Sequence, residues 1–274
     1  MTHAYGEPSY WDQRYQSDPG TFDWYQKYPS LAPLFDRYLL RHHRLLLVGC
    51  GNSGVLTLHP VFLLGSTHLC YRFEPINLRM DASSSVSRSS LGESMVDDGY
   101  QDVVNIDISS VVIEAMQMKH MDKQGLKYIN MDVRDMSLFQ SSSFDAVIDK
   151  GTLDSLMCGH DAMQNATKML LEVDRVLKDK GVYILITYGG PSYRLYMLRS
   201  IQRWAINLHV IDRVEKSPGP KTWTLTNPVP LNTDGSSIAT LLGSNPEVHY
   251  IYVCTKLESQ RLPQNETDDV TAEQ

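Results

Sequence analysis

Residues 45–54 read Leu-Leu-Leu-Val-Gly-Cys-Gly-Asn-Ser-Gly. Four consecutive apolar residues ended by a glycine are typical of a short strand buried on both faces of a parallel sheet. In the turn that follows, Gly49 and Gly51 have no Cβ atom, so a ligand can approach the backbone closely. The stretch therefore predicts the first strand of a parallel α/β sheet, with a ligand-binding turn at its carboxyl end.

Three more apolar segments have the length of strands, and each is followed directly by an aspartate. The segments are residues 102–106, 126–131 and 144–148, followed by Asp107, Asp132 and Asp149. Ligands of doubly wound sheets bind outside the carboxyl ends of the strands. We therefore expect these acids to share one site with the glycine turn.

The remaining segments predict an α/β fold with a doubly wound, mostly parallel, seven-stranded sheet. Residues 108–119 and 167–177 have the apolar spacing of helices, and residues 182–187 predict a fifth strand. Strands that alternate with helices imply parallel pairing through right-handed crossovers. Two later strands, at residues 208–214 and 248–256, are separated by prolines without a convincing helix, so we expect them to form a C-terminal antiparallel hairpin.

Residues 54–90 do not fit this alternation. Positions 54–64 are apolar and β-like, whereas positions 82–90 are almost entirely serine, which is a linker composition. We expect one domain over residues 1–257 that contains this insertion as a loop or disordered segment. The polar, acidic tail at residues 258–274 is expected to be disordered.

The composition narrows the classes of function. The net charge of −7 argues against nucleic acid as the main partner and is compatible with a basic protein substrate. The four cysteines contain no CxxC pair and the nine histidines lack metal spacing, so we expect no metal site. Residues 1–9 are polar, so we expect no leader, and no apolar run approaches the roughly 18 residues of a membrane span. We expect a cytoplasmic monomer without a membrane partner.

The acids at the strand ends have the chemistry of a nucleoside site. A carboxylate after the second strand can accept both ribose hydroxyls, and one after the third can accept the adenine amino group beside the Val133 amide. Structural alternatives exist for each acid. Asp107 could cap the next helix, Asp132 could form a turn, and Asp149 could pair with Lys150 in solvent.

Gly49, Gly51 and Gly54 also match the Gly-x-Gly-x-x-Gly pattern of dinucleotide-binding domains. Such domains normally continue with parallel strands, whereas this chain predicts a hairpin. No residue pair suited to handling a nicotinamide is evident, and no Gly-x-Ser-x-Gly hydrolase elbow occurs. A nicotinamide oxidoreductase is therefore the least favoured interpretation.

Several stretches match, in order, the motifs of one family. They are Tyr10-Trp11-Asp12-Gln13-Arg14-Tyr15, Phe22-Asp23-Trp24-Tyr25, Val48-Gly49-Cys50-Gly51-Asn52-Ser53, Asp107-Ile108-Ser109-Ser110, Met131-Asp132-Val133-Arg134 and Asp149-Lys150-Gly151-Thr152-Leu153-Asp154. On these residues the chain resembles the class I S-adenosylmethionine-dependent methyltransferases, in the methyltransferase-like family that includes the elongation factor 1-alpha lysine methyltransferases. The resemblance extends from about Tyr10 to Tyr193, and its most specific block begins at Asp149.

The insertion departs from the family, whose members run from Gly-Asn-Ser directly into a helix like residues 91–96. Asp107 lies 56 positions after Gly51, whereas this crossover takes about 20. Removing residues 54–90 leaves 19 positions. The serine-rich composition favours an alternatively spliced or mispredicted segment over a genuine surface loop, and Gly54 then belongs to the insertion.

The resemblance implies S-adenosyl-L-methionine as cofactor, S-adenosyl-L-homocysteine as product, and no metal. The implied cofactor-binding residues are Trp11, Tyr15 and Trp24 as a cover, Gly49 at the methionine moiety, Gly51 in the same turn, Asp107 and Ile108 at the ribose, Asp132 and Val133 at the adenine, and Lys150 near the reacting end. Asp149 is a catalytic candidate, as acceptor of the proton that leaves the substrate. On composition alone, the N-terminal aromatic residues could instead be core.

The implied function is protein-lysine N-methylation of a protein such as a translation elongation factor. Two alternatives remain at this point. A small-molecule methyltransferase would share every cofactor residue and differ in the acceptor pocket. A catalytically impaired cofactor-binding protein would result if the insertion deforms the glycine turn.

Overall fold

The computed structural model describes residues 4–17, 25–52, 90–213, 223–243 and 246–258. The predicted insertion, apart from Ser90, and the predicted tail, apart from Glu258, lie outside these ranges. Ser90 itself is part of the folded domain, because its side chain accepts a hydrogen bond from the Glu93 amide and caps the helix that follows.

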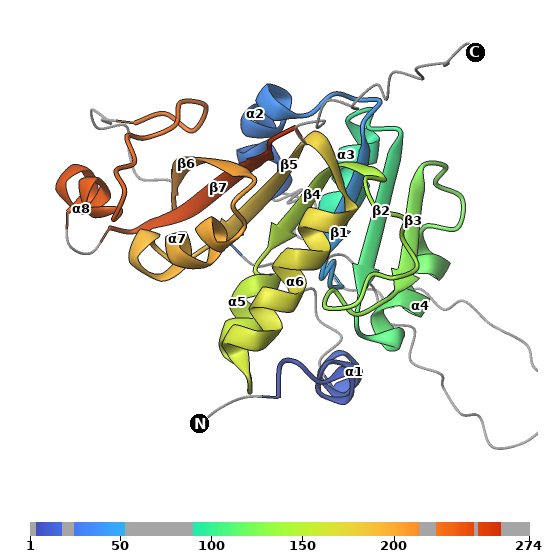
Figure 1. Cartoon of the computed structure of the whole chain (residues 1–274). Helices are drawn as coiled ribbons and strands as arrows, with labels where there is room; N and C mark the ends of the chain where they lie inside the picture. The colour runs from blue at the N-terminus through green and yellow to red at the C-terminus, as the bar shows by residue number, and fades with distance from the viewer. Residues whose placement is uncertain (1–3, 18–24, 53–89, 214–222, 244–245, 259–274) are drawn as a thin grey trace, which may run out of the picture.

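A seven-stranded sheet in the order β3-β2-β1-β4-β5-β7-β6 forms the centre of the molecule (Figure 1). Its strands are β1 Arg44–Val48, β2 Asp102–Asp107, β3 Leu126–Asn130, β4 Phe144–Lys150, β5 Leu177–Thr187, β6 Trp204–Asp212 and β7 Val248–Lys256. The first five strands pair in parallel, and β7 runs antiparallel to both β5 and β6. The predicted fold class and the C-terminal antiparallel hairpin are confirmed.

Helices cover both faces of this sheet. They are α1 Pro8–Ser17, α2 Tyr28–Tyr38, α3 Leu91–Asp97, α4 Ser110–Lys119, α5 Thr152–Met157, α6 Ala162–Val176, α7 Pro191–Ser200 and α8 Ser236–Leu242. Alternate residues of β1 face opposite cores: Leu46 packs in the core that contains α6 and α7, and Leu45 in the core that contains α2, α3 and α4. Every side chain of β1 after Arg44 is buried, as expected for a central parallel strand.

The connection between β6 and β7 corrects the sequence prediction, because it contains helix α8. This helix is short and begins with local caps: the Asp234 carboxylate accepts the Ser236 amide, and the Asn232 side chain accepts the Ser237 amide. Capping of this kind stabilises a helix start without any long apolar repeat. The prolines obscured it in the sequence.

Other element bounds also differ from the prediction. Helix α4 begins at Ser110 because Ser109 is its cap, and α6 begins at Ala162, directly after Asp161 with its positive φ of 50°. Leu177, predicted as the end of a helix, instead begins β5, where an irregularity separates its pairing with Phe144 from the regular register. Strand β6 runs from Trp204 rather than from residue 208.

Two absences concern only the part of the chain that the structure describes. Within the described ranges, no helix is both long and apolar enough to cross a membrane. Across the same ranges, histidine, cysteine, aspartate and glutamate side chains do not gather in groups of three or more that could hold a metal ion.

Candidate active site

A cavity lies at the carboxyl ends of β1, β2 and β4, between the sheet and helix α1. It is lined by the described residues of the predicted cofactor set, which are Trp11, Tyr15, Gly49, Gly51, Asp107, Ile108, Asp132, Val133 and Lys150. Trp24 lies outside the described residues. The fold thus brings together side chains that are up to 139 positions apart in the sequence, from Trp11 to Lys150.

The turn after β1 requires glycine at its first position. Gly49 has a φ of 61°, and a Cβ atom added there would lie 2.1 Å from Thr152 Oγ1. Thr152 cannot easily retreat, since its hydroxyl donates to the Val48 carbonyl at 2.9 Å. The glycine turn is therefore packed directly against the start of α5.

Asp107 holds the same turn from the other side. Its carboxylate accepts the Gly51 amide and the Ser109 amide, each at 3.0 Å, and the residue is 6% exposed. Burial raises the pKa of Asp107 to about 6, although these amide hydrogen bonds oppose the rise. The residue that caps helix α4 is Ser109 and not Asp107, because the Ser109 hydroxyl accepts the Val112 amide at 3.3 Å. Asp107 itself lines the cavity.

Helix α1 covers the cavity and is fastened to α4. Asp12 accepts hydrogen bonds from the Ser109 hydroxyl at 2.5 Å and from the Val111 amide at 3.3 Å. The Trp11 indole donates to the Tyr5 carbonyl at 2.8 Å, and both residues line the cavity. Of the described N-terminal aromatic residues, Tyr5, Trp11 and Tyr15 thus face a cavity.

Arg134 is a cavity residue to which the sequence analysis assigned no role. Its guanidinium contacts both carboxylate oxygens of Asp132, at 2.7 to 3.0 Å. The same guanidinium donates to the Gly6 carbonyl at 2.7 Å and to the Asn165 side chain at 3.3 Å. Arg134 therefore ties the end of β3 to the segment before α1. The motif Met131-Asp132-Val133-Arg134 contained it, but its partner Gly6 is 128 positions away.

Asp149 is not among the residues that line the cavity, and its catalytic role stays a prediction. Its carboxylate accepts the Thr152 amide at 2.7 Å, the Leu153 amide at 3.1 Å and the Tyr183 hydroxyl at 2.8 Å. The residue is fully buried, and burial raises its pKa to about 7. It is therefore not half of a solvated pair with Lys150 either. Asp149 organises the first turn of α5, while Lys150 faces the cavity.

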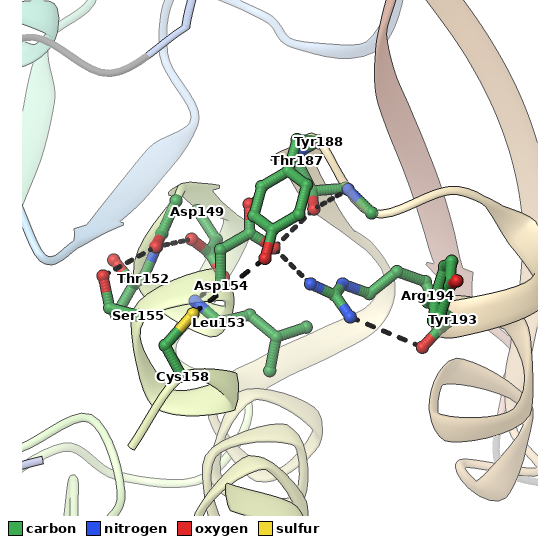
Figure 2. A network of polar contacts seen from close by, with 12 residues as sticks. Asp149, Thr152, Leu153, Asp154, Ser155, Cys158, Thr187, Tyr188, Tyr193 and Arg194 are labelled. Carbon is green, nitrogen blue, oxygen red and sulfur yellow. Dashed lines mark hydrogen bonds and ion pairs between the residues drawn. The ribbon is translucent and has the colours of Figure 1, made fainter. Parts of the chain in front are cut away.

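Next to the cavity, Asp154 is the centre of a buried polar network (Figure 2). Its carboxylate accepts the Tyr25 hydroxyl and the Thr187 hydroxyl, both at 2.5 Å, and the Arg194 guanidinium at 2.6 Å. The Tyr188 amide donates to it at 3.3 Å. Asp154 closes the Lys-Gly-Thr-Leu-Asp block, but no sequence signal indicated these partners.

Comparisons with known proteins identify the chain. A family model described as a methyltransferase domain matches residues 92–218. A mouse protein named EEF1A lysine methyltransferase 4 is 29% identical over 213 residues, which cover 74% of this chain and 69% of the relative. The chain belongs to the S-adenosylmethionine-dependent methyltransferase family.

Two further relatives of this methyltransferase come from cattle. The EEF1A lysine methyltransferase 4 is 30% identical, over 70% of this chain and 64% of the relative. The eEF1A lysine and N-terminal methyltransferase is 31% identical over 76% of this chain. The methyltransferase spans only 25% of that longer relative.

Solved structures agree with the fold of this methyltransferase. A structure on the conversion of a disulfide bond into a thioacetal group during echinomycin biosynthesis has a TM-score of 0.53 and 13% identity, and the match covers 92% of this chain and 93% of the other. A chain of the complex with the Haloferax volcanii Trm112 methyltransferase activator has a TM-score of 0.51 and 10% identity, with coverage of 95% and 100%.

Proposed function

We propose that this methyltransferase transfers a methyl group from S-adenosylmethionine to a lysine ε-amine of elongation factor 1-alpha. The observation that carries the proposal is the cavity itself, which gathers every described residue of the expected cofactor set. We infer the acceptor from the relatives, because the mouse and cattle proteins are named as lysine methyltransferases of this factor.

The residues of the cavity suit the parts of the proposed cofactor. Gly49 offers an open backbone beside the methionine moiety, where a Cβ atom has no room. The buried Asp107 carboxylate, with Ile108, suits the ribose hydroxyls, and Asp132 with the Val133 amide suits the adenine. Trp11 and Tyr15 supply aromatic faces, which attract a cation such as a sulfonium. When bound, S-adenosylmethionine supplies an electrophilic methyl group.

The chain's own contribution to the reaction is mainly positioning. A free lysine amine has a pKa of about 10.4, so the acceptor has to be held in its neutral form. Desolvation beside aromatic residues favours the neutral amine. Holding two reactants in line supplies a large part of a rate enhancement without a strong base. The burial of Asp149 behind α5 agrees with a site of this kind.

The proposed enzyme acts in the cytoplasm as a monomer, on protein rather than nucleic acid, and without a metal ion. Its net charge of −7 supports a partner with basic surface and not a polyanion.

The decisive experiment incubates the full chain with radiolabelled S-adenosylmethionine and recombinant elongation factor 1-alpha. We expect label in the elongation factor, on lysine after acid hydrolysis. Label in small molecules of an undialysed extract, with none in protein, would instead identify a small-molecule methyltransferase. A thermal shift with S-adenosylhomocysteine but no label in any acceptor would identify a cofactor-binding protein without turnover.

A further inference from the structure

The Asp154 network is a buried, charge-balanced cluster with a positional role. The side chains of Asp154 and Arg194 are only 5% and 4% exposed. A buried ion pair contributes little net stability, because desolvation offsets the attraction. In addition, Arg194 Nε is buried and finds no hydrogen-bond partner among the described residues. Because the Asp154–Arg194 ion pair contributes little net stability, the segments that it holds in position explain it better.

The cluster joins four segments that are distant in sequence. Asp154 lies on α5, beside Ser155, which lines the cavity. Its partners come from the segment before α2, from the end of β5 and from α7, as Figure 2 shows for Thr187, Tyr188 and Arg194. Asp154 therefore ties these segments to α5, a helix that lines the cavity.

The backbone around the cluster is adapted to it. A Cβ atom at Gly189 would lie 2.5 Å from both Nε and Cζ of Arg194, so the guanidinium passes directly over this residue. Tyr25 has a φ of 64°, a conformation that costs a non-glycine residue energy. Its hydroxyl bond to Asp154 holds it there.

Two tyrosine residues bind Asp154 beside α5, the helix whose Ser155 lines the cavity: Tyr25 through its hydroxyl and Tyr188 through its amide. The rings of Tyr25 and Tyr188 are 6.4 Å apart and inclined by 50°. Tyr188 is 46% exposed, and its hydroxyl lies 3.9 Å from Sγ of the exposed Cys158. Burial is the main cause of a raised pKa for both tyrosines, so their hydroxyls stay neutral.

The chemistry of the Tyr25 and Tyr188 rings suits the binding of an alkyl amine. Aromatic faces cover the methylene groups of a long side chain and attract its cationic end. The Asp154 carboxylate is already matched by Arg194, so it does not trap the acceptor as an ammonium ion. A wall of this kind accepts a lysine and permits its deprotonation.

We propose that Tyr25 and Tyr188 are the walls that hold the acceptor lysine side chain beside the Lys150 end of the cavity, and that Asp154 and Arg194 are positioning residues for them. This inference rests on the proposed lysine methylation and extends it to the acceptor subsite.

The test measures kcat and KM separately for cofactor and for recombinant elongation factor 1-alpha. Tyr188→Ala removes an aromatic wall, so we expect the KM for the acceptor to rise about tenfold, the size of one aromatic contact to a cation. Tyr188→Phe keeps the ring and restores the KM. The KM for S-adenosylmethionine and the thermal shift with S-adenosylhomocysteine stay unchanged in both variants.

Tyr193→Ala is the matched control, since Tyr193 is 68% exposed and lies beyond Arg194 from Asp154 (Figure 2). We expect it to leave all constants unchanged. Asp154→Asn should raise the acceptor KM while the cofactor KM is preserved, which a general loss of fold would not produce.

Two results would overturn the inference in different ways. If the wild-type protein labels elongation factor 1-alpha and Tyr188→Ala keeps the wild-type acceptor KM, the acceptor walls are elsewhere and the proposed function stands. If the wild-type protein labels no lysine, the proposed function fails and this inference fails with it.

Discussion

The Asp107 carboxylate accepts a hydrogen bond from the Gly51 amide at 3.0 Å, across 56 positions of sequence. The contact joins the end of β2 to the glycine turn after β1, so the residue proposed to hold the ribose also shapes the turn beside it. Loss of this one side chain affects two parts of the cavity.

Replacing Asp107 with alanine should therefore abolish cofactor binding. Two hydrogen bonds to a charged group contribute about 1.5–3 kcal/mol each, so the affinity for S-adenosylhomocysteine should fall at least about 100-fold. Isothermal calorimetry measures it directly. Asp97→Ala is the control, because Asp97 is an exposed acid that pairs only with Lys123 among the contacts described. Unchanged affinity in Asp107→Ala would remove this residue from the cofactor site.

Cofactor affinity should also depend on pH through Asp107. Burial raises its pKa to about 6, and only the ionised carboxylate accepts from both ribose hydroxyls. Affinity should therefore be full above the folded pKa and fall as the pH drops below it, by up to about tenfold per pH unit. Calorimetry from pH 5 to pH 8 tests this. A profile without a step in Asp107→Asn and with one in the wild type assigns the step to Asp107.

Replacing Asp149 should change the pH dependence of the free energy of unfolding rather than catalysis. Its pKa rises from an unfolded value of about 3.9 to about 7 in the folded protein, because of burial. The folded state thus binds the proton more tightly, and this group's contribution to the free energy of unfolding falls as the pH rises from about 4 to 7.

Urea denaturation of the wild type and Asp149→Asn at pH 5 and pH 7.5 measures that contribution as a difference. We expect the variant to lose less stability than the wild type between these two values. Its S-adenosylhomocysteine binding should persist at pH 7.5. Loss of binding with intact folding would instead give Asp149 a role in cofactor binding.

Gly49→Ala should destabilise the protein and weaken cofactor binding. The new methyl group would meet Thr152 Oγ1 at 2.1 Å, and the φ of 61° adds strain of about 1–3 kcal/mol. Gly243→Ala separates the two causes, since Gly243 has a φ of 84° but nothing within 4 Å of an added Cβ atom. Thermal melts of both variants give the cost of the clash as their difference. Adding Thr152→Ala to Gly49→Ala should recover part of it.

Arg134→Ala should loosen the cover of the cavity. The variant loses the link from Asp132 to the Gly6 carbonyl, so the KM for S-adenosylmethionine should rise about tenfold, as for one charged hydrogen bond. Arg134→Lys cannot reproduce the two-pronged contact and should recover little. Arg41→Ala removes an exposed arginine that also pairs with two acids and should leave the KM unchanged.

The positions and carboxyl ends of the first four strands could be predicted from the sequence because their signals are local. Apolar runs ended by Gly49, Asp107 and Asp132 are enough, since parallel strands bring their carboxyl ends to one edge. Asp149 shows the limit of this reasoning. Neighbouring residues at a strand end point to opposite faces, and composition does not tell which of Asp149 and Lys150 faces the cavity.

Arg134 and Asp154 could not be assigned roles for a different reason. Their partners Gly6 and Tyr25 are 128 and 129 positions away, and no periodicity reports contacts of that kind. Helix α8 could not be predicted from an amphipathic repeat, because local capping stabilises its start.

The place of β7 between β5 and β6 has a consequence for how the protein is made. Both neighbours precede it in the chain, yet each pairs with it along most of its length. During synthesis β5 and β6 therefore emerge as unpaired edges, which are open to association with other chains. The sheet is complete only when residues 248–256 have left the ribosome. A chain that stops before Val248 should therefore be recognised by chaperones and degraded, rather than accumulate as a smaller enzyme.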